Sequence, residues 1–101
     1  MKVLARSFSI FLLATLPSLA TDELIILTPH GEGIRREFEE GFKISYRNNT
    51  GREVDVIWLD VGGASDILRY IRSEYRNRPD GIRVDLFFGG GTDPYRELKR
   101  Q

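Results

Sequence analysis

The chain contains no cysteine among its 101 residues, and only one histidine and one tryptophan. Without cysteine it can form no disulfide and no thiolate metal site. It also lacks an excess of charge of either sign, since 15 Lys and Arg balance 15 Asp and Glu, and the two signs are mixed along the sequence. A nucleic-acid footprint requires clustered basic charge, so we expect no nucleic-acid partner.

The longest apolar run of the chain lies near its start. Lys2 and Arg6 precede the apolar segment 10–16, and the segment 17–20 (Pro-Ser-Leu-Ala) follows it. A basic start, a short apolar centre and small residues are typical of a secretory signal peptide, and the run is short for a bilayer core about 30 Å thick. We therefore predict a signal peptide over residues 1–20 and a periplasmic location. The alternatives are an uncleaved anchor or a buried first helix; no cysteine follows the run, which excludes a lipoprotein anchor.

Residues 21–101 carry the folded part. Without Lys2 and Arg6 they hold 13 Lys and Arg against 15 Asp and Glu, a net charge of −2. About 80 residues bury only a modest core, near the lower limit for a domain that is stable alone. The sequence shows no internal repeat and no low-complexity tract.

Three hydrophobic strand patterns each run into a glycine-bearing turn and then into an amphipathic helical pattern. Nearly continuous apolar strands are typical of parallel sheets that helices cover on both faces. The patterns predict strands over 23–28, 53–59 and 83–88, and helices over 32–48, from 64 to about 78, and from 93 onward.

Helical spacing places Ile34, Phe38 and Phe42 on the apolar face of the first helix and Arg35 on its solvent side. Asn and Gly in the segment 48–51 predict its C-terminal end, because both tolerate the left-handed conformation. The second helix has an apolar face of Ala64, Ile67, Leu68, Ile71 and Tyr75. The third begins at Asp93-Pro94, with Asp93 as the expected N-cap.

Each strand-helix-strand unit spans about 30 residues, the usual size of a right-handed crossover between parallel strands. The sequence therefore predicts an α/β fold, a three-layer α-β-α arrangement with a small parallel sheet as its middle layer. The last helical pattern runs to Gln101 without a cap or a fourth strand. Because three parallel strands would leave apolar edges unprotected, we expect an incomplete domain.

The three turns should gather at the carboxyl edge of the sheet, where helix N-termini offer free N–H groups to a ligand. In the first turn Gly31 and Gly33 flank Glu32, and His30, the only histidine, precedes them. These residues equally suit an ordinary helix start, with Glu32 at the positive end of the helix dipole. His30 and Glu32 are weak candidates for metal ligands, because two residues on one loop cannot complete a site.

The second turn contains Gly63, Ala64 and Ser65. Ser65 or Asp66 is expected to cap the second helix. The backbone amides of this turn and the Ser65 hydroxyl are also candidate donors to a carboxylate or phosphate oxygen.

The third turn contains Gly90, Gly91 and Thr92 directly after Gly89. Consecutive glycines lose much conformational entropy on folding, so they indicate a need for close approach or movement, and we include this turn in the candidate ligand site. The neighbouring aromatic strand residues Trp58, Phe87 and Phe88 are expected in the core.

Three segments together resemble the N-terminal lobe of extracellular solute-binding proteins of bacterial ABC importers. They are LIILTPHGEGIRREFEEGFK, VDVIWLDVGGASDILRYI and VDLFFGGGTDPYRELK, preceded by the leader. The branch that includes ferric-iron and thiamine binding proteins is the most similar, and the resemblance covers essentially the whole chain. It implies two α/β lobes joined by a hinge, of which residues 21–101 would be the incomplete N-terminal part.

The resemblance also implies a function and partners. Such proteins hold a small molecule or a metal ion in the cleft between the lobes and deliver it to ABC permease subunits in the membrane. His30 and Glu32 fall on positions that ligate ferric iron in some members, which also use tyrosines from the second lobe. We accordingly expect a monomer without a cofactor, with ferric iron as one candidate ligand beside thiamine, a polyamine, a phosphorylated compound or a sugar acid.

An enzyme is the alternative class. Dinucleotide binding is not supported, because the first turn lacks G-x-G-x-x-G spacing and no glycine-rich loop is followed by Lys-Ser or Lys-Thr. A hydrolase would need a nucleophile beside a base, whereas Ser65 and His30 lie on separate turns and no G-x-S-x-G motif is present. We therefore expect no catalysis, and keep the remnant of an exported α/β hydrolase as the alternative.

Overall fold

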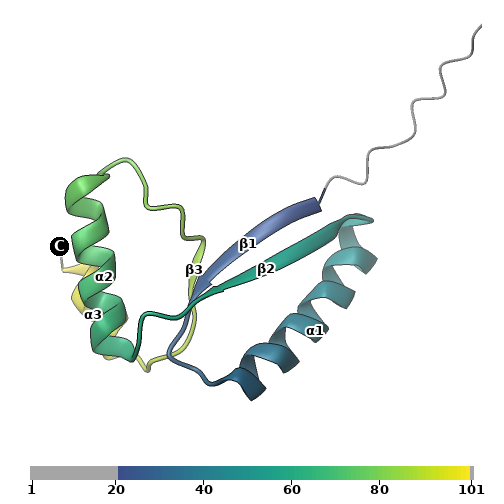
Figure 1. Cartoon of the computed structure of the whole chain (residues 1–101), viewed down its shortest axis with the longest axis horizontal. Helices are drawn as coiled ribbons and strands as arrows, with labels where there is room; N and C mark the ends of the chain where they lie inside the picture. The colour runs from purple at the N-terminus through teal and green to yellow at the C-terminus, as the bar shows by residue number, and fades with distance from the viewer. Residues whose placement is uncertain (1–20, 101) are drawn as a thin grey trace, which may run out of the picture.

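A computed structural model describes residues 21–100 as alternating strands and helices (Figure 1). The elements are β1 (Thr21–Leu27), α1 (Glu32–Thr50), β2 (Glu53–Leu59), α2 (Ala64–Asn77), β3 (Leu86–Phe87) and α3 (Asp93–Lys99). The predicted signal peptide lies outside the described residues, so this assignment stays a prediction. Of the helices described, none has the length and apolar character that a bilayer span requires.

The three strands form one parallel sheet with the order β2-β1-β3. β1 pairs with β2 along its whole length, from Thr21 opposite Glu53 to Leu27 opposite Leu59. On its other side β1 pairs with β3 over two positions, Ile26 with Leu86 and Leu27 with Phe87. The prediction of a mixed α/β fold with a small parallel sheet is confirmed.

Helices contact both faces of this sheet. The strand pairing assigns each contact to a face, because side chains alternate along each strand. On one face, Phe38 of α1 packs edge-on against Trp58 of β2, with ring centroids 5.8 Å apart. On the opposite face Leu27 enters the main core cluster with Ile67 and Ile71 of α2, and Ile82 completes this cluster. α1 therefore lies along β2 (Figure 1), and α2 contacts the carboxyl end of β1 through Leu27.

The apolar face predicted for α1 is only partly used. No residue of α1 is buried, and Ile34 is 49% exposed. Phe38 and Phe42 stack with centroids 5.8 Å apart, and Phe38 also contacts Phe88. α1 therefore lies on the sheet through its aromatic rings. Its predicted end is confirmed, since Gly51 adopts a left-handed φ of 69° as the C-cap.

The third strand is shorter than the predicted range 83–88. Arg83 has a positive φ of 57°, which is incompatible with an extended strand at that position. In addition, the Asp85 carboxylate accepts the Ile25 N–H at 2.9 Å, the place that a strand carbonyl would take. The Asp85 side chain thus takes one position of the backbone ladder, while the Asp85 N–H still donates to the Ile25 carbonyl at 2.9 Å. Regular pairing is limited to Leu86–Phe87.

A polar cluster fastens the end of α1 to the start of β1. Asp22 accepts hydrogen bonds from the Tyr46 hydroxyl and from Arg52, whose Nε lies 2.8 Å from the carboxylate. The hydrogen bond from Arg52 lowers the pKa of Asp22 to about 2, and the bond from Tyr46 adds to this shift. The same contact raises the pKa of Tyr46.

This cluster predicts an acid-dependent contribution to stability. The pKa of Asp22 is lower in the folded chain than its ordinary value of about 4, so its contribution is complete above pH 4 and is lost as the pH falls towards 2. The Asp22→Asn variant should therefore have a lower thermal midpoint than the parent at pH 6, and the difference should shrink towards pH 2. Thermal unfolding followed by circular dichroism across this range measures it; a difference that does not depend on pH would contradict the assignment.

Candidate functional site

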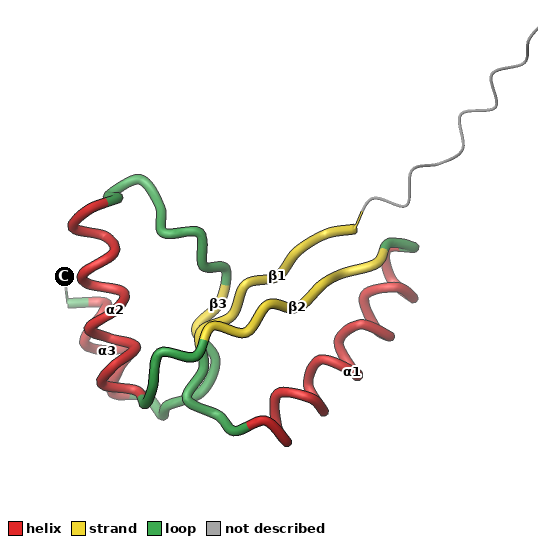
Figure 2. The backbone as a smooth tube through the Cα atoms, in the orientation of Figure 1, coloured by secondary structure: helices red, strands yellow, loops and turns green. Residues whose placement is uncertain are grey.

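The turns that follow the three strands lie together at the carboxyl edge of the sheet. We call these turns, residues 28–33, 60–65 and 88–92, the rim. Because the strands are parallel, each turn leaves the sheet at the same end, as the loops in Figure 2 show. Specific contacts connect all three turns, so the predicted convergence is confirmed as geometry.

Thr28 connects the first and third turns. Its side chain is fully buried, and its Oγ1 donates a hydrogen bond of 2.6 Å to the Phe88 carbonyl. The same oxygen accepts the N–H of His30 at 3.2 Å. The His30 ring then packs against Phe88, with centroids 5.1 Å apart.

Glycine at position 89 makes room for this histidine. A Cβ on Gly89 would lie 2.3 Å from His30 Nε2, far inside van der Waals contact. Gly89, Gly90 and Gly91 all have positive φ angles, of 92°, 85° and 76°. Both observations explain why the third turn consists of glycine: the backbone is left-handed there and the first turn approaches it closely.

The second turn contacts both of its neighbours. A Cβ on Gly90 would lie 3.3 Å from the Cβ of Ala64, so the third turn passes directly over the start of α2. Arg35 donates from Nε to the His30 carbonyl at 2.7 Å, and its Nη2 lies 3.3 Å from Asp60 Oδ2. The placement of Arg35 on the solvent side was wrong, since its side chain is only 19% exposed.

The helix starts at the rim differ in how they are capped. α1 begins after Gly31, which is extended and makes no side-chain cap. At α2 the N-cap is Gly63, which makes no side-chain cap. Its own N–H donates to Asp66 Oδ2 at 3.1 Å, so Asp66, and not Ser65, makes the side-chain bond at this helix start. At α3 the N-cap position is Thr92, without a side-chain cap, and the predicted N-cap Asp93 is the first helical residue.

The candidate site residues divide into exposed and covered groups. In the first turn His30 is half-buried, and Gly31 and Glu32 are exposed. In the other turns the exposed candidates are Gly63, Ser65, Gly91 and Thr92, and the half-buried ones are Ala64 and Gly90. Within residues 21–100, no group of three or more His, Cys, Asp or Glu residues is arranged to hold a metal ion. His30 with Glu32 therefore remains a hypothesis for iron.

Three residues that organise the rim were not among the predicted site residues: Thr28, Arg35 and Tyr95. The Tyr95 hydroxyl donates to the Gly89 carbonyl at 2.7 Å, and the Phe87 carbonyl lies 3.1 Å from the same oxygen. The sequence could have indicated Thr28, because this polar residue directly follows an apolar strand. It could not have indicated Arg35 or Tyr95, because both lie in helical segments where such side chains are ordinarily exposed.

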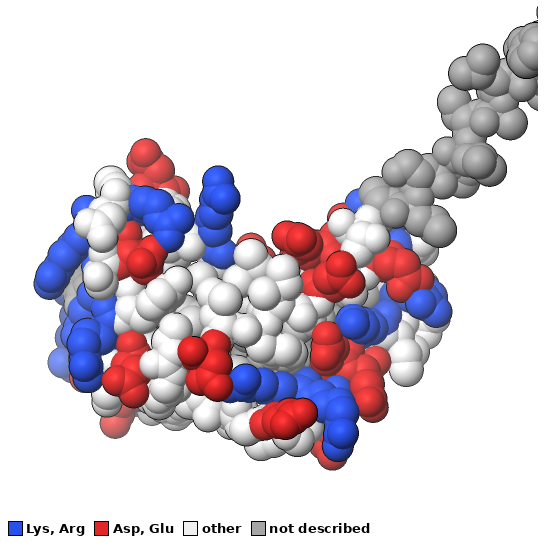
Figure 3. Space-filling model, in the orientation of Figure 1, with Lys and Arg blue, Asp and Glu red and all other residues white. Residues whose placement is uncertain are grey.

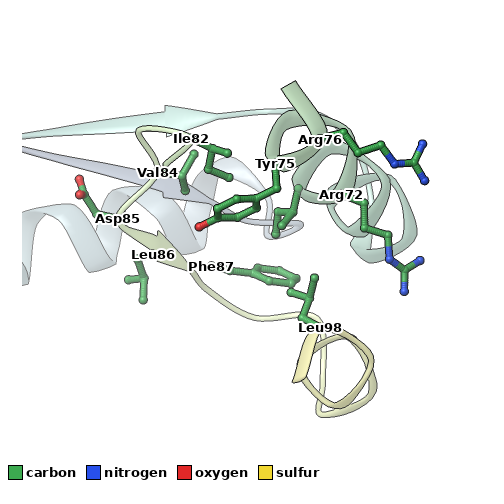
Figure 4. A pocket seen from close by; sticks show the side chains of 10 residues that line it. Arg72, Tyr75, Arg76, Ile82, Val84, Asp85, Leu86, Phe87 and Leu98 are labelled. Carbon is green, nitrogen blue, oxygen red and sulfur yellow. The ribbon is translucent and has the colours of Figure 1, made fainter. Parts of the chain in front are cut away.

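A hollow on the surface of the described residues lies away from the rim. It has a volume of about 860 Å³ and lies between α2, the segment 82–87 and Leu98 of α3 (Figure 4). None of the predicted site residues lines it. The sequence did not indicate this hollow, because the helical pattern places Tyr75 on the apolar face of α2. In the structure Tyr75 lines the hollow and is 47% exposed.

Comparisons with family models, with curated proteins and with solved structures find no match to this chain. The architecture of the described residues is a small parallel α/β sheet whose three turns contact one another at its carboxyl edge.

Proposed function

We propose that this chain is the N-terminal part of an exported solute-binding protein, which captures a small molecule or a metal ion and delivers it to an ABC permease in the membrane. The observation that supports this most is the convergence of three turns at one rim. In open parallel α/β sheets ligands bind at this edge. The resemblance of the sequence to solute-binding lobes also puts the ligand site at this edge. The proposal includes no catalytic activity.

The rim offers groups that suit an oxyanion. The first N–H groups of a helix have no partner within it, and no side chain caps those of α1. Gly31, Gly33 and Gly91 each have open space where a Cβ would lie, so a ligand can reach the backbone there. The hydroxyls of Ser65 and Thr92 are exposed at the neighbouring helix starts. A carboxylate or phosphate group, or iron held with such an anion, matches these donors.

On this proposal, residues 21–100 supply one wall of a binding cleft. In a two-lobed receptor, ligand contacts to both walls favour the closed state, so each wall alone retains only part of the affinity. We therefore expect the rim to bind weakly, with a dissociation constant of about 0.1–1 mM.

Titration calorimetry of the full chain with ferric citrate and, separately, with thiamine monophosphate tests the proposal, because both ligands carry oxyanions. We expect saturable binding of one ligand per chain for at least one of the two. If ferric citrate binds through the first turn, Glu32→Gln should weaken it about tenfold, equal to about 1.4 kcal/mol. Glu40→Gln is the matched control, because it removes the same charge from an exposed position of α1 within the same helix.

Absence of saturable heat for both ligands at millimolar concentration would contradict the proposal for these ligands. Equal weakening by Glu32→Gln and Glu40→Gln would show a general charge effect and would remove the first turn from the site.

A further inference from the structure

No further inference is drawn: the strongest candidate, the hollow in the uncharged surface between α2 and the segment 82–87 (Figure 3), carries nothing, because nothing in the structure shows what covers it.

Discussion

Gly89→Ala is expected to destabilise the protein by about 3 kcal/mol, one of the largest effects of any single methyl group in this chain. The positive φ of 92° costs an alanine about 1–2 kcal/mol, because a Cβ clashes with its own backbone in the left-handed region. The new Cβ also meets His30 Nε2 at 2.3 Å. The His30 side chain can rotate away only by giving up its ring contact with Phe88, which adds to the backbone cost. Urea denaturation followed by circular dichroism measures the loss.

Gly91→Ala provides the matched control. Gly91 has a similar φ of 76°, but no atom lies within 4 Å of the position of its Cβ. Only the backbone cost of about 1–2 kcal/mol applies there. In a His30→Ala background, the cost of Gly89→Ala should fall to the same level. Equal costs for Gly89→Ala and Gly91→Ala in the parent chain would contradict the contact between the first and third turns.

Leu27→Ala is expected to destabilise the protein by about 3–4 kcal/mol, because Leu27 is fully buried in the main core cluster between the sheet and α2. A domain of about 80 residues has a total stability of roughly 4–12 kcal/mol, so this single change removes a large share of it. The cluster has only three other buried members, Ile67, Ile71 and Ile82, and so little material to fill the cavity.

The same denaturation experiment with Ile44→Ala gives the comparison, since Ile44 is 64% exposed on α1. We expect a change within about 0.5 kcal/mol. If Leu27→Ala were as mild as Ile44→Ala, the core would have to lie elsewhere than between β1 and α2.

The order and type of the elements could be predicted from the sequence, because apolar periodicity reports directly on burial. The segments 23–28 and 64–77 show this best: nearly continuous apolar character predicted β1, and helical spacing around Ile67 and Ile71 predicted α2. The length of β3 could not be predicted. It depends on the positive φ of Arg83 and on a side-chain bond from Asp85 to a strand sixty residues away, and neither leaves a periodic signal.

The place of the candidate site could also be predicted, because parallel strands bring the turns after them to one edge. The contacts that connect the turns could not be predicted. Thr28 and Arg35 act through partners that are distant in sequence, Phe88 and Asp60, and the amphipathic pattern assigns Arg35 to solvent. Long-range pairs of this kind are set by the packing of the elements and not by local spacing.

An engineered disulfide tests the convergence of the turns most directly, because the chain has no cysteine of its own. A Cβ at position 90 lies 3.3 Å from the Cβ of Ala64, close to the separation of about 3.5–4.5 Å in disulfides. Ala64→Cys combined with Gly90→Cys should therefore oxidise within one chain. Ala64→Cys with Gly41→Cys, whose position in α1 has no neighbour within 4 Å, should not.

Mass spectrometry of the folded, mildly oxidised full chain measures disulfide formation. We expect a monomeric product two hydrogens lighter for the variant with cysteines at 64 and 90, and free thiols for the variant with cysteines at 64 and 41. Free thiols at positions 64 and 90, or cross-links only between chains, would contradict the convergence of the second and third turns.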